Sequence, residues 1–153
     1  MFPSHCQAAL KEWAVVVRAL GQGDQILLLR KGGISEVGKH FKVAYPEFLL
    51  YPTMEHQKKE LLKEDHQEHL ENLLTEGHDS SSIIFAYWAK TEDVIELSEE
   101  EQLHGLFSHH IWTEYYAQSR LRWKPRHPLS AMLLRIYRMQ APVTVPYKSY
   151  FGG

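Results

Sequence analysis

Residues 12–30 read EWAVVVRALGQGDQILLLR, and this stretch carries the clearest structural pattern in the chain. Two apolar runs, residues 12–20 and 25–30, flank the turn-forming sequence Gly21, Gln22, Gly23, Asp24. β-Branched residues favour strands, and a short loop containing glycine is typical of a hairpin. The pattern therefore predicts a β-hairpin. An alternative is that residues 7–13 begin as a short helical turn that leads into the first strand.

The middle of the chain alternates between strand-like and helix-like segments. Residues 47–51 (EFLLY) and 83–89 (IIFAYWA) have strand composition. Residues 54–76 carry leucines at helical spacing on one face, which predicts an amphipathic helix. Thr53 is the expected N-cap of this helix and Gly77 its C-terminal stop.

The C-terminal part predicts one more helix and late strands. Residues 98–101 (SEEE) have the pattern of a capping box, which opens a helix with Leu103, Leu106 and Phe107 on its core face. Residues 112–123 are expected to be the end of a helix followed by a strand, and residues 131–139 (AMLLRIYRM) favour a strand over a helix. This order predicts an α+β fold: a mixed or antiparallel sheet, or a small barrel, with two or three helices on one side.

Composition indicates one soluble globular domain over residues 1–153, because 44% of residues are hydrophobic and 24% are charged. Cys6 is the single cysteine, which leaves no disulfide framework and indicates a reducing compartment. No apolar run is long enough to cross a bilayer, and the N-terminus lacks the pattern of a signal peptide. We expect a cytoplasmic protein without a membrane partner.

Charge is distributed unevenly over the last third of the chain. Residues 91–114 contain seven acidic residues and no Lys or Arg, whereas residues 115–153 contain seven basic residues and no Asp or Glu. If Arg120, Arg122 and Lys124 lie on a strand, their alternate spacing turns all three to one face. The same region supplies further candidates for an interface: Arg135, Arg138, Tyr115, Tyr116 and Trp123.

Arginines beside aromatic rings are typical of nucleic-acid interfaces, because guanidinium groups hold phosphates and flat rings stack on exposed bases. This pattern favours DNA or RNA as a partner. The rival interpretation is internal: the basic residues pair with the acidic residues of 91–114, and the aromatic residues belong to the core.

No catalytic set, cofactor or metal site is predicted, and we lean toward a protein that is not an enzyme. Glu55 and His56 are the nearest candidates for catalysis. No Asp or Glu is followed two residues later by Lys, an arrangement common in metal-dependent nucleases. His66 and His69 lie on adjacent turns of the predicted helix, but two histidines fall short of the three or four ligands of a metal site.

Five segments, in order, carry a family resemblance: KEWA at 11–14, LLLRKGGI at 27–34, FLLYPT at 48–53 followed by EHQ at 55–57, LRIYRM at 134–139, and APV at 141–143. Together they resemble an uncharacterised bacterial group, domain-of-unknown-function family 1802. The resemblance covers nearly the whole chain. Relatives continue into a closing strand, which implies that the C-terminal end, residues 150–153, is shortened here.

The resemblance draws attention to Arg30, Lys31, Gly32 and Gly33, and to Glu55 with His56 and Gln57. A Gly-Gly loop lets the backbone approach a ligand closely, and Lys31 with His56 supplies a cation and a proton donor or acceptor. The alternative is structural: a tight loop and a helix N-terminus.

Some family members are joined to restriction-type endonuclease domains, which implies a role in DNA recognition or defence and a nuclease partner. The layout also looks like small barrels that bind RNA or modified bases, an analogy of fold alone. The resulting hypothesis is a nucleic-acid-binding accessory module of a restriction or defence system. The alternatives are a metal-dependent nuclease or hydrolase and a protein–protein interaction module.

Overall fold

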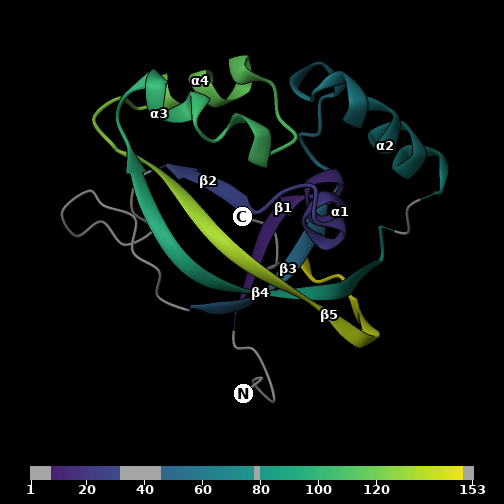
Figure 1. The fold of residues 1–153 in the computed structure, drawn as a ribbon. Helices are drawn as coiled ribbons and strands as arrows, with labels where there is room; N and C mark the ends of the chain where they lie inside the picture. Colours follow the sequence, from purple (N-terminus) through teal and green to yellow (C-terminus); the bar gives the residue numbers. More distant parts are fainter. Residues whose placement is uncertain (1–7, 32–45, 78–79, 150–153) are drawn as a thin grey trace.

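The computed structural model of the chain describes residues 8–31, 46–77 and 80–149. Figure 1 shows these residues as a curved sheet with helices packed against it. In chain order the elements are β1 (Ala9–Trp13), α1 (Ala14–Gln22), β2 (Leu27–Lys31), β3 (Glu47–Thr53), the 3-10 turn η2 (Lys59–Leu61), α2 (Glu64–Thr75), β4 (Ser82–Leu97), α3 (Glu100–His104), the 3-10 turn η3 (Phe107–His109), α4 (Glu114–Arg122) and β5 (Leu129–Pro146). The predicted Gly32–Gly33 loop, Cys6 and residues 150–153 lie outside the described ranges.

The sheet is mixed and has the strand order β1-β3-β4-β5-β2. β1 runs parallel to β3, and the remaining neighbours are antiparallel. β4 and β5 form the longest ladder and curve strongly, with α2, α3 and α4 above them in Figure 1. The predicted α+β class with a mixed sheet is confirmed, as are the strands at 47–51, 83–89 and 131–139, each of which is longer than expected. No helix of the described residues is long and apolar enough to span a membrane.

The hairpin predicted over residues 12–30 is wrong, because this segment is a strand, a helix and a second strand. The alternative of a helical turn over residues 7–13 is also wrong where the structure describes it, since Ala9–Trp13 is β1. Five apolar side chains of α1 are buried: Val15, Val16, Val17, Ala19 and Leu20. Tertiary burial therefore outweighs the modest preference of valine for strands.

The glycine-rich sequence after α1 ends the helix and does not turn a hairpin. Gly23 has φ 85°, a left-handed conformation that glycine adopts without strain. The Asp24 amide donates to the Ala19 carbonyl at 2.9 Å, which satisfies a carbonyl at the helix end. β1 and β2 consequently do not pair and become the two edges of the sheet.

Arg30 bridges these two edges. Its guanidinium donates to the Lys11 carbonyl at 2.7 Å and lies 3.2 Å from the Glu12 carboxylate. The Glu12 side chain is buried, with 6% of its surface exposed, whereas that of Arg30 is 23% exposed. Residues of the KEWA and LLLRKGGI segments thus hold the open sheet in its curved, barrel-like form.

The predicted helix over residues 54–76 is shorter than expected. Thr53 is the last residue of β3 and not an N-cap, and α2 begins only after Lys63. The Lys63 ammonium donates to the His110 carbonyl at 2.5 Å and also to the Phe107 carbonyl, which joins α2 to η3. Gly77, with φ 88°, follows the helix end, so the predicted stop is confirmed.

The capping box of α3 lies one residue later than predicted. The Gln102 side-chain oxygen accepts bonds from the backbone amides of Ser98 at 2.8 Å and Glu99 at 3.0 Å. Of the predicted core face, Leu103 is buried and Leu106 packs partly against the core. Phe107 is 39% exposed, so its assignment to the core was wrong.

The segment from 112 to 123 contains a helix, and the strand predicted at its end is wrong. The Thr113 hydroxyl accepts a bond from the Tyr116 amide at 3.1 Å and caps α4. A threonine before an acidic first turn is a regular start signal for a helix. Arg120 and Arg122 therefore lie on a helix, with consequences for the predicted basic row.

The main hydrophobic core lies between the sheet and the helices and receives buried side chains from all five strands and all four α-helices. Trp112 is 1% exposed and stacks on Tyr116, with ring centroids 5.2 Å apart. A smaller cluster of Tyr51, Ile83 and Phe85 packs separately.

Candidate nucleic-acid interface

Trp123 is an exposed aromatic residue whose ring is contacted by two basic side chains, one before it and one after it in the sequence. It follows the last residue of α4 and is 47% exposed. The Arg120 guanidinium carbon lies 4.6 Å from the ring centroid, and the Lys124 ammonium lies 4.5 Å from it. Lys124 has φ 48°, a left-handed conformation that turns the chain sharply at this point. Arg120, from the last turn of α4, and Lys124, at this turn of the chain, thus contact the same indole ring.

Lys31, at the end of β2, joins this group from a distant part of the sequence. Its ammonium donates to the Leu121 carbonyl at 2.6 Å, near the C-terminus of α4. Partial burial lowers the pKa of Lys31, and repulsion from Arg120 lowers it further. The structure thus places Lys31 close enough to Arg120 for the two charges to repel. We call Lys31, Arg120, Trp123 and Lys124 the Trp123 cluster.

The Trp123 cluster adjoins the bridge between the sheet edges. Burial raises the pKa of the Tyr116 hydroxyl, as does the Glu12 carboxylate, whereas Arg120 and Arg30 act in the opposite direction. Tyr116 is therefore within electrostatic reach of both the bridge and the cluster. Its ring packs against Trp13 and Trp112, so it serves the core, as the rival interpretation of the sequence expected.

The basic row predicted from Arg120, Arg122 and Lys124 does not exist as a row. Residues i and i+2 of a helix point about 200° apart around its axis, so Arg120 and Arg122 face different directions. Arg122 lies 2.5 Å from the Glu100 carboxylate of α3. The structure keeps Arg120 and Lys124 together through Trp123 and separates Arg122 from them.

Internal pairing accounts for part of the basic segment. Besides Arg122 with Glu100, Arg135 on β5 lies 3.0 Å from the Glu92 carboxylate. Within the described ranges, no carboxylate forms an ion pair with Lys31, Arg120 or Lys124. The Trp123 cluster therefore holds positive charge that the described acidic residues do not neutralise.

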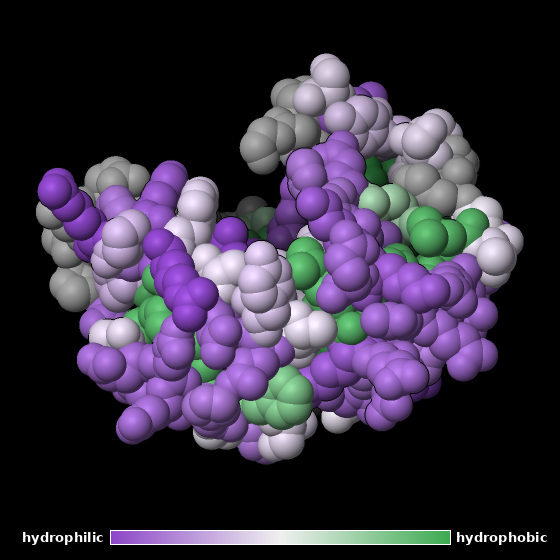
Figure 2. All heavy atoms as spheres, turned by 90° about the horizontal axis from the view of Figure 1, so that it is seen from above, coloured by the Kyte–Doolittle hydropathy of each residue, from purple (hydrophilic) through white to green (hydrophobic). Residues whose placement is uncertain are grey.

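The remaining aromatic and basic candidates are spread over the molecule. Tyr115, in the first turn of α4, is 67% exposed, and Arg138 is exposed on β5 opposite Tyr87. Figure 2 shows that the face carrying the helices is largely hydrophilic, with small hydrophobic patches between hydrophilic side chains.

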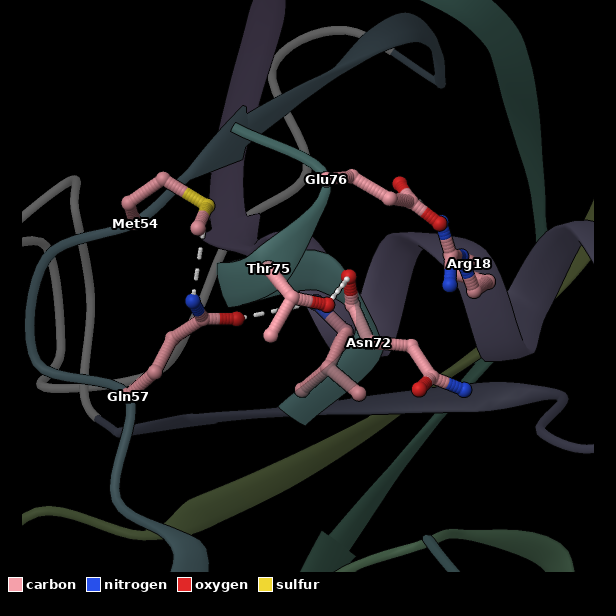
Figure 3. A network of polar contacts seen from close by, with 7 residues as sticks. Arg18, Met54, Gln57, Asn72, Thr75 and Glu76 are labelled. Carbon is pink, nitrogen blue, oxygen red and sulfur yellow. Dashed lines mark hydrogen bonds and ion pairs between the residues drawn. The ribbon is translucent and has the colours of Figure 1, made fainter. Parts of the chain in front are cut away.

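Gln57, of the family segment EHQ, has a structural role. Its side-chain oxygen accepts a bond from the Val15 amide at 2.9 Å, and its nitrogen lies 3.5 Å from the Met54 sulfur. Figure 3 shows this side chain reaching from the segment after β3 toward α1. The contact satisfies one of the free amides at the start of α1, which no local side chain caps. Gln57 therefore caps α1, and the helix that the sequence predicted to begin at Thr53 does not form there.

Glu55 and His56 occupy different positions. His56 is exposed and has φ 66°, an uncommon left-handed conformation for a residue other than glycine. Glu55 lines a groove beside Tyr51 and Tyr147. His56 is not among the lining residues of this groove, so the two candidates do not form an acid–base pair within it.

His66 and His69 face each other on α2, with 3.3 Å between their Nδ1 atoms. Burial lowers the pKa of His66, and the proximity of His69 adds to this effect. Across the described residues, no group of three or more His, Cys, Asp or Glu side chains is placed to hold a metal ion.

Sequence reasoning missed the bridge between Arg30 and Glu12 and the grouping of Lys31 with α4. The LLLRKGGI and KEWA segments of the family resemblance contain Arg30, Lys31 and Glu12, and they were the available signals. Arg30 is 18 positions from Glu12, and Lys31 is 90 positions from Leu121, so spacing alone could not identify the contacts.

Solved structures with a similar fold come from Zymomonas mobilis. The crystal structure of ASCH from that organism superposes with a TM-score of 0.51 and 12% identity, covering 93% of this chain and 73% of the other. A serine-to-alanine mutant of the same protein gives a TM-score of 0.53 and 12% identity, covering 95% of this chain and 76% of the other. The fold is thus similar to that of an ASCH protein.

The chain belongs to the family Domain of unknown function (DUF1802), which matches residues 9–153. The suspected family is confirmed. No curated protein matches the sequence. None of these comparisons supports a nuclease partner.

Proposed function

We propose that this protein is a nucleic-acid-binding module that contacts its ligand through the Trp123 cluster. One observation carries the proposal: the exposed Trp123 ring lies between Arg120 and Lys124, next to Lys31, and no described carboxylate pairs with these three cations. Clustered like charges raise the free energy of the unliganded surface. A polyanion relieves that repulsion when it binds.

The chemistry of the cluster suits an unpaired strand of RNA or DNA. Arginine and lysine hold phosphate oxygens, and an indole ring stacks on a base only where the base is not enclosed in a duplex. Arg120 and Lys124 lie near the ring, so a base that stacks on Trp123 brings its phosphates close to them. Lys31 adds a third positive charge from the end of β2.

The fold is compatible with this function but does not assign it, because one fold hosts many unrelated activities. The likeness to ASCH supports the scaffold only. The proposal depends on the local chemistry of the cluster. A hydrolase function is not proposed, because no arrangement of Glu55 and His56 favours it.

The test measures the binding of labelled single-stranded RNA, single-stranded DNA and duplex DNA by fluorescence anisotropy, at low and at physiological salt. The double variant Arg120→Gln/Lys124→Gln is expected to bind at least tenfold more weakly than the wild type. Lys58→Gln/Lys90→Gln is the matched control, because both lysines are exposed and its net charge is the same. Equal loss in both variants, or no binding by the wild type at low salt, would contradict the proposal.

A further inference from the structure

Two connected grooves lie beside the start of β4, apart from the Trp123 cluster. The larger has a volume of about 450 Å³ and includes Tyr51, Glu55 and Tyr147 in its lining. The smaller, of about 230 Å³, includes Leu73 and Glu76. Pro52, Met54, Ser82 and Ile83 line both grooves, so we treat the two as one depression.

The larger groove is acidic and aromatic. Among the described residues that line it, Glu55 is the only charged one. Burial raises the pKa of the Tyr51 hydroxyl, and the charges of Tyr147 and Glu55 raise it further, which shows that the three polar ends lie within electrostatic reach of one another. Tyr51 is therefore neutral at physiological pH. A carboxylate beside tyrosine rings attracts a cation and repels an anion.

The Tyr51 ring already attracts a positive charge of the protein itself. The Lys11 ammonium lies 5.2 Å from its centroid, and Lys11 is the direct neighbour of Tyr51 in the parallel pairing of β1 with β3. Lys11 does not line the groove, so Glu55 has no described cationic partner there.

The smaller groove continues the depression with an apolar surface. Its lining includes Ala14, Leu73, Ile83 and Ile84, and Ile84 is 54% exposed. Glu76, which also lines it, forms an ion pair of 3.0 Å with Arg18, and both residues are drawn in Figure 3. Each groove thus has one carboxylate in its lining, and the residues that the two grooves share are mostly apolar. Of the two carboxylates, Glu76 is paired with Arg18, and no ion pair of Glu55 is found among the described residues.

We propose that the depression binds a linear aliphatic amine of the polyamine class. One ammonium group lies at Glu55 between Tyr51 and Tyr147, and the methylene chain follows Met54 and Ile83 toward Leu73. A second ammonium reaches Glu76 and shares its carboxylate with Arg18. Sugars and nucleotides fit less well, because the apolar half leaves their hydroxyl groups unpaired and the acidic half repels phosphate.

This site uses none of the residues of the Trp123 cluster, so the two proposals stand or fall separately. A polyamine neutralises phosphate charge, and a module that holds both ligands would bring them together. Neither proposal requires the polyamine and the nucleic acid to bind at the same time.

The test is isothermal titration calorimetry of the full chain with spermidine, putrescine, n-butylamine and Mg²⁺ at physiological salt. Spermidine and putrescine are expected to bind more tightly than n-butylamine, which lacks a second ammonium, and Mg²⁺ is expected not to displace them. Glu55→Gln should weaken spermidine binding about tenfold, and Tyr147→Ala should weaken it more than Tyr147→Phe does.

Two controls make the result specific. Glu60→Gln removes an exposed carboxylate outside the grooves and should leave binding unchanged. Arg120→Gln/Lys124→Gln should also leave amine binding unchanged while it weakens nucleic-acid binding. The proposal is overturned if Glu55→Gln binds spermidine as the wild type does, if Glu60→Gln weakens binding equally, or if Mg²⁺ competes at equal concentration.

Discussion

The guanidinium of Arg30 on β2 lies 3.2 Å from the carboxylate of Glu12 on β1, across the gap between the two edges of the sheet. The same guanidinium donates to the Lys11 carbonyl at 2.7 Å. Because the Glu12 side chain is only 6% exposed, its charge depends on Arg30 for compensation. The bridge also positions β2, whose last residue, Lys31, contributes to the Trp123 cluster.

Arg30→Met should lower the free energy of unfolding by about 2–4 kcal/mol, because it leaves the Glu12 carboxylate buried without a partner. The double variant Glu12→Gln/Arg30→Met should recover part of this loss, since the unpaired charge is gone. Urea unfolding of the wild type, both single variants and the double variant measures the coupling. Strictly additive effects would show that the ion pair does not stabilise the sheet edges.

Gly21→Ala should destabilise the protein by about 1–3 kcal/mol through overpacking. A Cβ atom at this position would lie 2.3 Å from Cζ of Tyr87, closer than van der Waals contact permits. Gly105→Ala is the matched control, because the nearest atom to its added Cβ is 3.6 Å away. In thermal unfolding, the midpoint temperature of Gly21→Ala should lie well below that of Gly105→Ala. Truncating the ring, as in Gly21→Ala/Tyr87→Ala, should remove the additional penalty of the alanine.

Gln57→Leu should cost about 1 kcal/mol, because it removes the oxygen that accepts the Val15 amide at the start of α1. Gln57→Glu keeps an acceptor and adds negative charge at the helix N-terminus, so it should retain most of the stability. Chemical denaturation of the three proteins separates these outcomes. Equal losses in both variants would assign the effect to packing around Met54.

Stability should fall as the solution is acidified from pH 6.5 toward pH 4, in part because of His110. Burial lowers the pKa of this histidine to about 4, and the nearby charges of Lys63 and His109 contribute, whereas a hydrogen bond with the Trp112 backbone opposes the shift. The unfolded chain takes up the proton near pH 6.5, so protonation favours unfolding. The stabilisation is complete above that pH and is lost on acidification.

The full effect of His110 is of the order of 3 kcal/mol. Denaturation midpoints of the wild type and His110→Gln are compared at neutral pH and near pH 4.5. The carboxylates titrate in both proteins, so the difference between the two proteins reports the contribution of His110. The variant should lose less stability between the two pH values. Parallel curves for the two proteins would assign the acid sensitivity to other groups.

The salt dependence of nucleic-acid binding should report how many phosphates the Trp123 cluster contacts. Removing Arg120 and Lys124 should reduce the slope of log affinity against log salt by about 1.4 for a single strand, or by about 1.8 for a duplex. Trp123→Ala should weaken single-strand binding by about 1–3 kcal/mol with little change in slope, because stacking releases no counterions. Trp123→Phe should bind more tightly than Trp123→Ala. A slope unchanged by the charge variants would place the phosphates elsewhere.

Local patterns predicted those parts of the fold that depend on local interactions. The strands at 47–51 and 83–89 have apolar and aromatic residues, with two β-branched residues in the second, and these suit a sheet in almost any surrounding. Gly77 ends α2 because a left-handed conformation is available to glycine without strain, and this property belongs to the residue itself. The α+β class followed from the order of such segments.

Tertiary contacts decided the rest. Residues 14–22 are helical because burial of α1 against the sheet outweighs the strand preference of Val15, Val16 and Val17. The candidate interface shows the same dependence on distant contacts. The sequence by itself placed Arg120, Trp123 and Lys124 in one basic and aromatic segment, but only the α4 helix and its sharp turn brought both cations to the indole ring and sent Arg122 to Glu100. Lys31 joined them across 90 residues because β2 pairs with β5 at the far edge of the sheet, a relation that no local spacing encodes.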